Sequence, residues 1–130
     1  MVFVDTNYFL RFLLKDNSVQ SKLAIELFQK ASENKIKLCT SVVVFFEIYW
    51  VLKSFYKKDN LYISNVLQQL LKLDFINYEN HEILHSAVNN VDFYNYDLED
   101  AYNCIYSQSL KIKTFKTFDK KLNVKYKLCA

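Results

Sequence analysis

Short apolar segments alternate along this chain with longer segments of helical periodicity. Apolar runs near residues 2–4, 36–39, 74–78, 112–118 and 124–128 predict strands. Apolar positions three or four residues apart predict helices at about residues 8–14, 21–31, 41–55, 61–73, 80–92 and 98–110. Such alternation favours a parallel sheet with helices on both faces. No linker or repeat interrupts it, so we expect a single α/β domain over residues 1–130.

The chain contains neither glycine nor proline. Turns that need a positive φ must therefore use other residues, and Asn and Asp tolerate that region best. We expect turns at Asn17, Asn34, Asn60, Asn80, Asn95 and Asn123.

The composition is that of an ordinary globular protein, with 52% hydrophobic and 24% charged residues. The net charge of +3 permits an anionic partner without requiring one. The three cysteines, Cys39, Cys104 and Cys129, are widely spaced and indicate reduced thiols. The first residues do not resemble a signal peptide, and the longest apolar run contains Glu47 and is too short to span a membrane. We therefore expect a cytoplasmic protein.

Three acidic residues stand at positions that favour a ligand site. Asp5 and Asp119 each follow a predicted strand, and ligands bind beyond the carboxyl ends of strands in an open parallel sheet. Taken singly, each is also explained as a helix cap. Glu47 is the only charge in the segment SVVVFFEIYWVL, and a buried carboxylate is costly unless it is paired or bound to a metal. We therefore expect a functional role for Glu47.

Three further acids, Asp97, Glu99 and Asp100, lie at the start of a predicted helix, where the helix dipole favours them. If Asp97 is the N-cap, Asp100 is the third helical residue and can face Asp5, whereas Glu99 faces elsewhere. Gathered carboxylates bind Mg²⁺, and a pair of metal ions can clamp a phosphoryl displacement. The pattern therefore predicts metal-dependent cleavage of a phosphodiester.

These motifs resemble the PIN-domain ribonucleases, and specifically the small VapC-like toxins of VapBC toxin–antitoxin pairs. The matching segments are VDTN at residues 4–7, Glu47 in FFEIYWVL, DLEDAY at residues 97–102 and TFDKKL at residues 117–122. The resemblance implies a three-layer α/β/α sandwich with a mainly parallel central sheet. It also implies an endoribonuclease that uses Mg²⁺ or Mn²⁺ to cleave single-stranded RNA.

The resemblance also implies roles for individual residues. Asp5, Glu47, Asp100 and Asp119 would be the catalytic, metal-binding acids, with Asp97 as an additional ligand. Thr6, Asn7 and Thr117 would be supporting polar residues. Family members commonly have a glycine after the helix that follows the third acid, and this chain has none, so another residue must end that helix.

Lysines are frequent in the last 20 residues. Lysine contacts to phosphates give affinity for nucleic acid that does not depend on base sequence, although lysines also protect exposed strand edges. Both interpretations stay open for Lys113, Lys116, Lys120 and Lys121, which are our predicted RNA-binding residues.

The segment HEILH, from His81 to His85, matches the H-E-x-x-H motif of zinc proteases. A catalytic zinc takes three protein ligands, and the chain has no third histidine. We therefore favour an ordinary surface helix. A non-toxin PIN nuclease and an inactive PIN-like scaffold are further alternatives. A haloacid-dehalogenase-type phosphatase would need an Asp at the position of Asn7.

The resemblance implies an antitoxin protein as partner, besides the RNA substrate. We expect a disordered antitoxin segment that folds into an amphipathic helix in an apolar groove. The predicted groove residues are Tyr8, Phe9 and Phe12, with the helix around residues 42–52. Tyr56 and Tyr62 would suit a homodimer face.

Overall fold

The computed structural model describes residues 1–128. These residues form three short strands, seven α-helices and one π-helical turn. In chain order the elements are β1 (Val2–Phe3), α1 (Thr6–Leu14), α2 (Ser18–Ser32), β2 (Leu38–Thr40), α3 (Val42–Trp50), η1 (Val51–Phe55), α4 (Asn60–Leu71), β3 (Ile76–Tyr78), α5 (His81–Phe93), α6 (Leu98–Ser109) and α7 (Lys120–Leu128).

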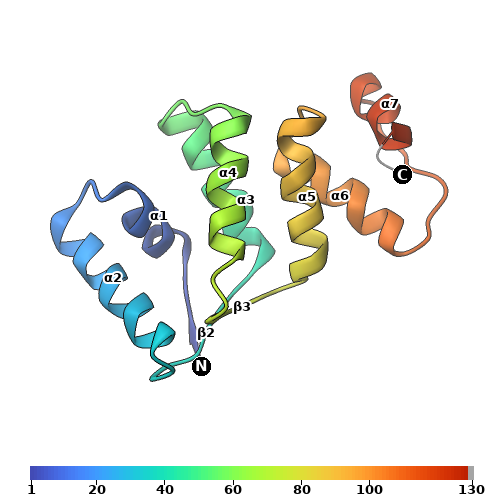
Figure 1. Cartoon of the computed structure of the whole chain (residues 1–130). Helices are drawn as coiled ribbons and strands as arrows, with labels where there is room; N and C mark the ends of the chain where they lie inside the picture. Colours follow the sequence, from blue (N-terminus) through green and yellow to red (C-terminus); the bar gives the residue numbers. More distant parts are fainter. Residues whose placement is uncertain (129–130) are drawn as a thin grey trace.

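The three strands form a parallel sheet in the order β1-β2-β3. Val2 pairs with Leu38, and Leu38 pairs with Ile76, so the carboxyl ends of all three strands lie at one edge of the sheet. The chain leaves this edge into α1, α3 and α5 (Figure 1). The α/β class and the parallel pairing predicted from the alternating pattern are confirmed.

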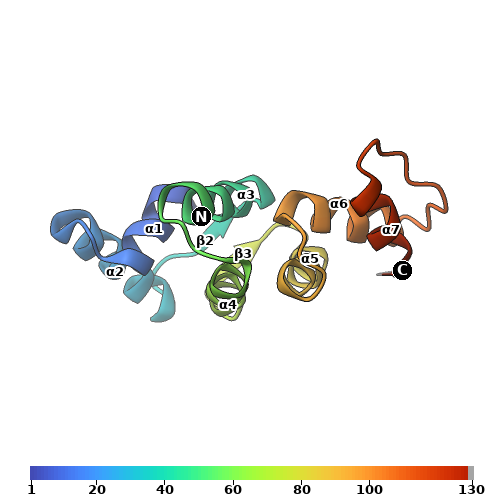
Figure 2. The ribbon, with the colours of Figure 1, turned by 90° about the horizontal axis from the view of Figure 1, so that it is seen from above.

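Helices lie on both sides of the strands, with α3 on one side of β2 and β3 and α4 on the other (Figure 2). α1 packs against α2 and α3, and α5 packs against α4 and α6. The core between these elements is built from fully buried aliphatic and aromatic side chains, which include Phe9, Phe45 and Tyr49. Phe9 contacts the rings of Phe28 and Phe45, and this contact joins α1, α2 and α3.

Polar residues begin the helices that follow the strands and loops. The side chains of Asp5, Asn17, Ser41 and Asp59 each accept a hydrogen bond from a backbone N–H in the first turn of the next helix. Such caps satisfy backbone donors that have no partner within the helix. The sequence also places Thr6 and Asn7 where either could cap the first helix. The cap is Asp5 instead, and α1 starts two residues before the predicted bound.

Six of the described residues have a positive φ. Three are Asn34, Asn80 and Asn95, at positions where we expected turns. The other three are lysines, one of which is Lys111, with φ 58°, next to the C-cap residue Leu110 of α6. Lys111 therefore occupies the left-handed position that follows this helix, which a glycine adopts without steric cost. The remaining predicted turn residues do not need a positive φ, since Asn17 is a cap and Asn60 and Asn123 are helical.

The two strands predicted near the carboxyl end are wrong. Residues 112–118 form no strand, and residues 124–128 belong to α7. Asp119 accepts the backbone N–H of Leu122 and so starts a helix. Helical spacing then buries both Leu122 and Tyr126, and Tyr126 stacks on Phe115 with ring centroids 4.6 Å apart. In a helix these two residues lie about one turn apart on the same face, whereas a strand would hold them about 13 Å apart.

An all-apolar run such as Val2 to Val4 predicts a strand that is buried on both faces. This prediction is also wrong. β1 is an edge strand, and the side chains of Val2 and Phe3 are exposed, whereas Val4 is 1% exposed. In the part of the chain that the structure describes, no helix has the length and apolar character needed to cross a membrane. Cys39 is a free thiol, and the buried Cys104 thiol lies 3.8 Å from the Tyr96 hydroxyl. Cys129 lies outside the described residues.

Candidate active site

Thr6 links two of the predicted acids at the carboxyl edge of the sheet. Its backbone N–H donates to Asp5 Oδ1 at 2.8 Å, and its hydroxyl donates to Glu47 Oε2 at 3.0 Å. Thr6 is buried and therefore holds the Glu47 carboxylate from a fixed position. This bond joins the residue after Asp5 to the middle of α3 across 41 residues of sequence.

Glu47 itself is exposed, so the expectation that it is a buried carboxylate is wrong. The apolar residues around it divide between two faces of α3. Val44 and Ile48 point into the core, whereas Val43 and Trp50 share the exposed face with Glu47. An unbroken apolar sequence therefore hides which side of the helix meets water.

α6 brings its acidic first turn to the same face of α3. Trp50 Nε1 donates to Glu99 Oε1 at 2.7 Å, and the rings of Phe46 and Tyr102 are in edge contact at 5.4 Å. In α3, Phe46 and Trp50 lie on either side of Glu47 in the sequence. In α6, Glu99 and Tyr102 lie on either side of Asp100. The Glu99 carboxylate thus meets α3 at Trp50.

Asp97 is the N-cap residue of α6, so Asp100 is the third helical residue, as the predicted phase required. The Asp97 side chain makes no capping hydrogen bond. Instead, its Oδ1 lies 3.3 Å from Lys53 Nζ and 3.1 Å from the Tyr49 hydroxyl. Tyr49 is fully buried, and burial, followed by the charge of Asp97 and its hydrogen bond, raises the pKa of the Tyr49 hydroxyl well above its usual range. The negative charge of Asp100 also raises the pKa of the Tyr49 hydroxyl, by a smaller amount.

Two residues at this sheet edge were not singled out in the sequence. Thr40, at the end of β2, is buried and donates its hydroxyl to the Val4 carbonyl at 2.9 Å. Glu79 follows β3, and its Oε1 accepts the backbone N–H of Val42 at 3.0 Å. Glu79 thus supports the first turn of α3, the helix that carries Glu47. Its position directly after a predicted strand is the signal that could have found it, as for Asp5.

Asp119 lies away from the other acids. It caps α7, which sits at the opposite end of the molecule from α1 in both views (Figures 1 and 2). Thr117 is beside it, since the Thr117 hydroxyl oxygen accepts the backbone N–H of Asp119 at 3.0 Å. The predicted RNA-binding lysines are exposed on the segment before α7 and on its first turn, namely Lys113, Lys116, Lys120 and Lys121.

The predicted acids suit a hard divalent cation by their chemistry, because Mg²⁺ prefers carboxylate and other oxygen ligands. Their arrangement is incomplete, however. Within residues 1–128, no three His, Cys, Asp or Glu side chains are grouped so that they could hold a metal ion. Asp5 and Glu47 meet through Thr6, Asp100 stands on the helix packed against α3, and Asp119 is remote.

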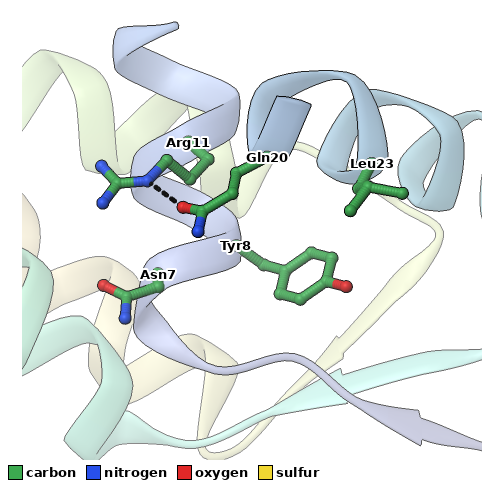
Figure 3. Close-up of a pocket in the computed structure, with 5 residues that line it drawn as sticks. All are labelled: Asn7, Tyr8, Arg11, Gln20 and Leu23. Carbon is green, nitrogen blue, oxygen red and sulfur yellow. Dashed lines mark hydrogen bonds between the residues drawn. The ribbon is translucent and has the colours of Figure 1, made fainter. Parts of the chain in front are cut away.

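Asn7 lines a small pocket between α1 and α2 (Figure 3). The pocket is completed by Tyr8, Leu23 and the pair Arg11–Gln20, in which Arg11 Nε donates to Gln20 Oε1 at 2.6 Å. A second groove, between α3 and α6, runs beside Glu47. It is lined by Val43, Phe46, Glu47, Trp50, Val51 and Glu99.

The HEILH segment lies on α5, with both histidines exposed. Their rings stack with centroids 6.4 Å apart, and His81 Nε2 lies 3.0 Å from the Leu71 carbonyl oxygen. No third ligand joins them among the described residues, and one nitrogen of His81 is already hydrogen-bonded. The segment is therefore the surface of a helix, and nothing in its geometry favours a zinc protease.

Comparison with known proteins agrees with this architecture. The sequence model of the PIN domain family matches residues 2–128 of this chain. Neither a curated protein nor a solved structure matches the chain. PIN domains are generally nucleases, and PIN nucleases typically use divalent metal ions. Since the match covers nearly the whole chain, this protein belongs to the PIN domain family.

Proposed function

We propose that the protein is a metal-dependent endoribonuclease that cleaves single-stranded RNA in the cytoplasm and acts as the toxin of a toxin–antitoxin pair. The observation that carries the nuclease proposal is the bond from Thr6 to Glu47, which holds one acid beside Asp5 at the carboxyl edge of the sheet. α6, which carries Asp100 in its first turn, packs on α3. Acids from three separate parts of the sequence would thereby act together at one end of a PIN domain.

In this proposal Asp5, Glu47 and Asp100 hold Mg²⁺ or Mn²⁺, with Asp119 as a fourth acid. When bound, such an ion polarises a phosphate oxygen and lowers the pKa of a bound water. Thr6 orients the Glu47 carboxylate, and Asp5 also caps α1. Because Asp119 starts α7, its participation requires α7 and the segment before it to approach β1.

The test compares cleavage of a fluorescent single-stranded RNA by the wild type and by Asp5→Asn, Glu47→Gln and Asp119→Asn, with Mg²⁺, with Mn²⁺ and with a chelator. Removal of a metal-binding carboxylate should reduce the rate by at least about 100-fold. Asp92→Asn, an exposed acid on α5, is the control. Cleavage by Asp5→Asn at the native rate, or full activity with the chelator, would rule out this site.

The exposed lysines provide the proposed contact to the RNA backbone. Lys113 and Lys116 lie in the segment before α7, and Lys120 and Lys121 in its first turn. Phosphate contacts of this kind bind RNA regardless of base sequence. They would hold the strand while the acids at the sheet edge act on one phosphodiester.

A free ribonuclease would damage its own cell, so the toxin proposal includes an antitoxin that covers the acids. The fold changes the expected groove, since Phe9 is fully buried and cannot line it. Val43 and Trp50 on α3 are exposed and line the groove beside Glu47, and Tyr8 is exposed on α1. An amphipathic helix of the antitoxin would fit such a surface, with a basic side chain near the acids.

Expression of the chain alone should arrest growth, and expression of the Asp5→Asn variant should not. Co-expression of a neighbouring gene for a DNA-binding protein with a flexible tail should restore growth. If the wild type cleaves RNA in vitro but does not affect growth, the protein is a non-toxin PIN nuclease. Tyr56 and Tyr62 remain the proposed homodimer face, and sedimentation of the wild type against Tyr62→Ala tests it.

A further inference from the structure

We propose that Asp97 is a positioning residue and not a metal ligand. Its contacts with Lys53 and Tyr49 fix the first turn of α6. The proposal rests on the proposed function in one respect, the role of Asp100 as a metal-binding acid. It gives different roles to two acids that lie three residues apart at the start of α6.

The Lys53 ammonium is fully engaged in this network. Its Nζ lies 2.9 Å from the Tyr49 hydroxyl, 3.2 Å from Asn60 Oδ1 and 3.3 Å from Asp97 Oδ1. An ammonium has three N–H donors, so each has an acceptor here. Nζ also lies 5.3 Å from the centroid of the Tyr49 ring, within the range of a cation–π contact.

Asn60 extends the network to the chain that leads into α6. Its Nδ2 donates to Asn95 Oδ1 at 3.0 Å and lies 3.4 Å from the Tyr96 carbonyl oxygen. The Tyr49 hydroxyl lies 2.7 Å from Asn60 Oδ1. One cluster of polar groups therefore connects α3, η1 and α4 to the loop that ends at Asp97. The start of α6 is fixed from three elements.

The Asp97 side chain behaves differently from the other aspartates that begin helices. Asp5 and Asp59 each accept a backbone N–H of their own helix, whereas Asp97 accepts none and turns to Lys53 and Tyr49. Its backbone still occupies the N-cap position, with φ −69° and ψ 150°. Asp97 therefore contributes to the placement of α6 through tertiary contacts rather than through a local cap.

The same contacts disfavour Asp97 as a metal ligand. A divalent cation bound to this carboxylate would lie close to the Lys53 ammonium, and two like charges at that range repel. Lys53 sits in the π-helical turn η1, and π turns inside helices often mark functional sites. Asp100, the third residue of α6, is then the acid of this helix to which we assign the metal.

The experiment measures two quantities on the full chain. One is Mn²⁺ affinity by titration calorimetry, and the other is hydrogen exchange of the amides of residues 101–104, which donate to the carbonyls of residues 97–100 and so report on the first turn of α6. We compare Asp97→Asn, Lys53→Met and Asp100→Asn, with Asp92→Asn as the control. Asp97→Asn and Lys53→Met should change Mn²⁺ affinity by less than about threefold and lower kcat about tenfold or more. Both should speed exchange in the first turn of α6 about tenfold, and their double variant should match either single variant.

Several results would overturn the proposal. One is a decrease of Mn²⁺ affinity in Asp97→Asn as large as that in Asp100→Asn, which would make Asp97 a ligand. Another is unchanged exchange of the amides of residues 101–104 in both Asp97→Asn and Lys53→Met. If the wild type binds no Mn²⁺, the proposed function fails, whereas faster exchange in these variants still supports the positioning role. If Lys53→Met does not fold, Lys53→Arg keeps the charge and should show the same exchange effect to a smaller extent.

Discussion

Replacing the Tyr49 hydroxyl should destabilise the protein at neutral pH and have less effect in alkali. Tyr49→Phe removes contacts to Asn60 at 2.7 Å, to Asp97 at 3.1 Å and from Lys53 at 2.9 Å. A hydrogen bond to a charged group contributes about 1.5–3 kcal/mol. Lys53 and Asp97 are each about a third exposed and keep their own ion pair, so water compensates part of the change. We therefore expect the free energy of unfolding of Tyr49→Phe to be about 1.5 kcal/mol lower than that of the wild type near pH 8, and we call this difference the deficit.

The deficit should shrink above pH 10 because the native state keeps this hydroxyl protonated. Burial is the main cause that raises the pKa of Tyr49 above its usual range. In the unfolded chain a tyrosine ionises near pH 10. Above that pH the unfolded wild type binds fewer protons than the native wild type, so its stability falls by about 1.4 kcal/mol per pH unit for this residue. Phenylalanine has no such proton, so the stability of Tyr49→Phe does not fall for this reason. The two proteins should therefore be equally stable near about pH 11.

The assay is equilibrium urea unfolding of the wild type and Tyr49→Phe at several values between about pH 8 and 11. Tyr8→Phe, which removes an exposed hydroxyl, controls for the removal of a tyrosine. A deficit that stays constant over this range would refute the argument that Tyr49 is held neutral in the folded protein. Equal stability at about pH 8 would refute the argument that the network stabilises the fold.

Three further predictions concern the carboxyl end and the core. Lys111→Gly should raise the unfolding free energy by about 1 kcal/mol, because a left-handed conformation is unfavourable for lysine, whereas Lys113→Gly should not stabilise. Changing Lys120 and Lys121 to Ala should weaken RNA binding. The slope of log affinity against log salt should decrease by about one for each phosphate that the wild-type lysines neutralise. An unchanged slope would show that these lysines do not bind phosphates. Phe9→Ala should lower the unfolding free energy by about 3–5 kcal/mol in urea unfolding, and a much smaller decrease would mean that the core closes over the cavity.

Much of the fold could be predicted from local sequence signals. The helices from α1 to α6 and the strands β2 and β3 follow the predicted alternation to within a few residues. The phase of α6 was also accessible, because an acidic residue before an apolar position is a typical helix start, and Asp97 is the N-cap. These features depend on neighbours a few positions apart, so the sequence contains the information directly.

The carboxyl end shows where local signals compete. Residues 124–128 contain alternating apolar residues, but the cap at Asp119 and the spacing of Leu122 and Tyr126 favour a helix. The choice depends on Phe115, against which Tyr126 stacks. That contact exists only after the segment before α7 has folded back, and a strand pattern read along the chain does not include it.

The sequence alone determined that acidic residues stand at the ends of strands and at the starts of helices in this PIN domain. The tertiary structure decided what they touch. Thr6 reaches Glu47 across 41 positions, and Lys53 reaches Asp97 across 44. These two pairs form because α3 packs against α1 and α6, which brings Glu47 to Thr6 and Lys53 to Asp97. The sequence next to each acid does not encode this packing.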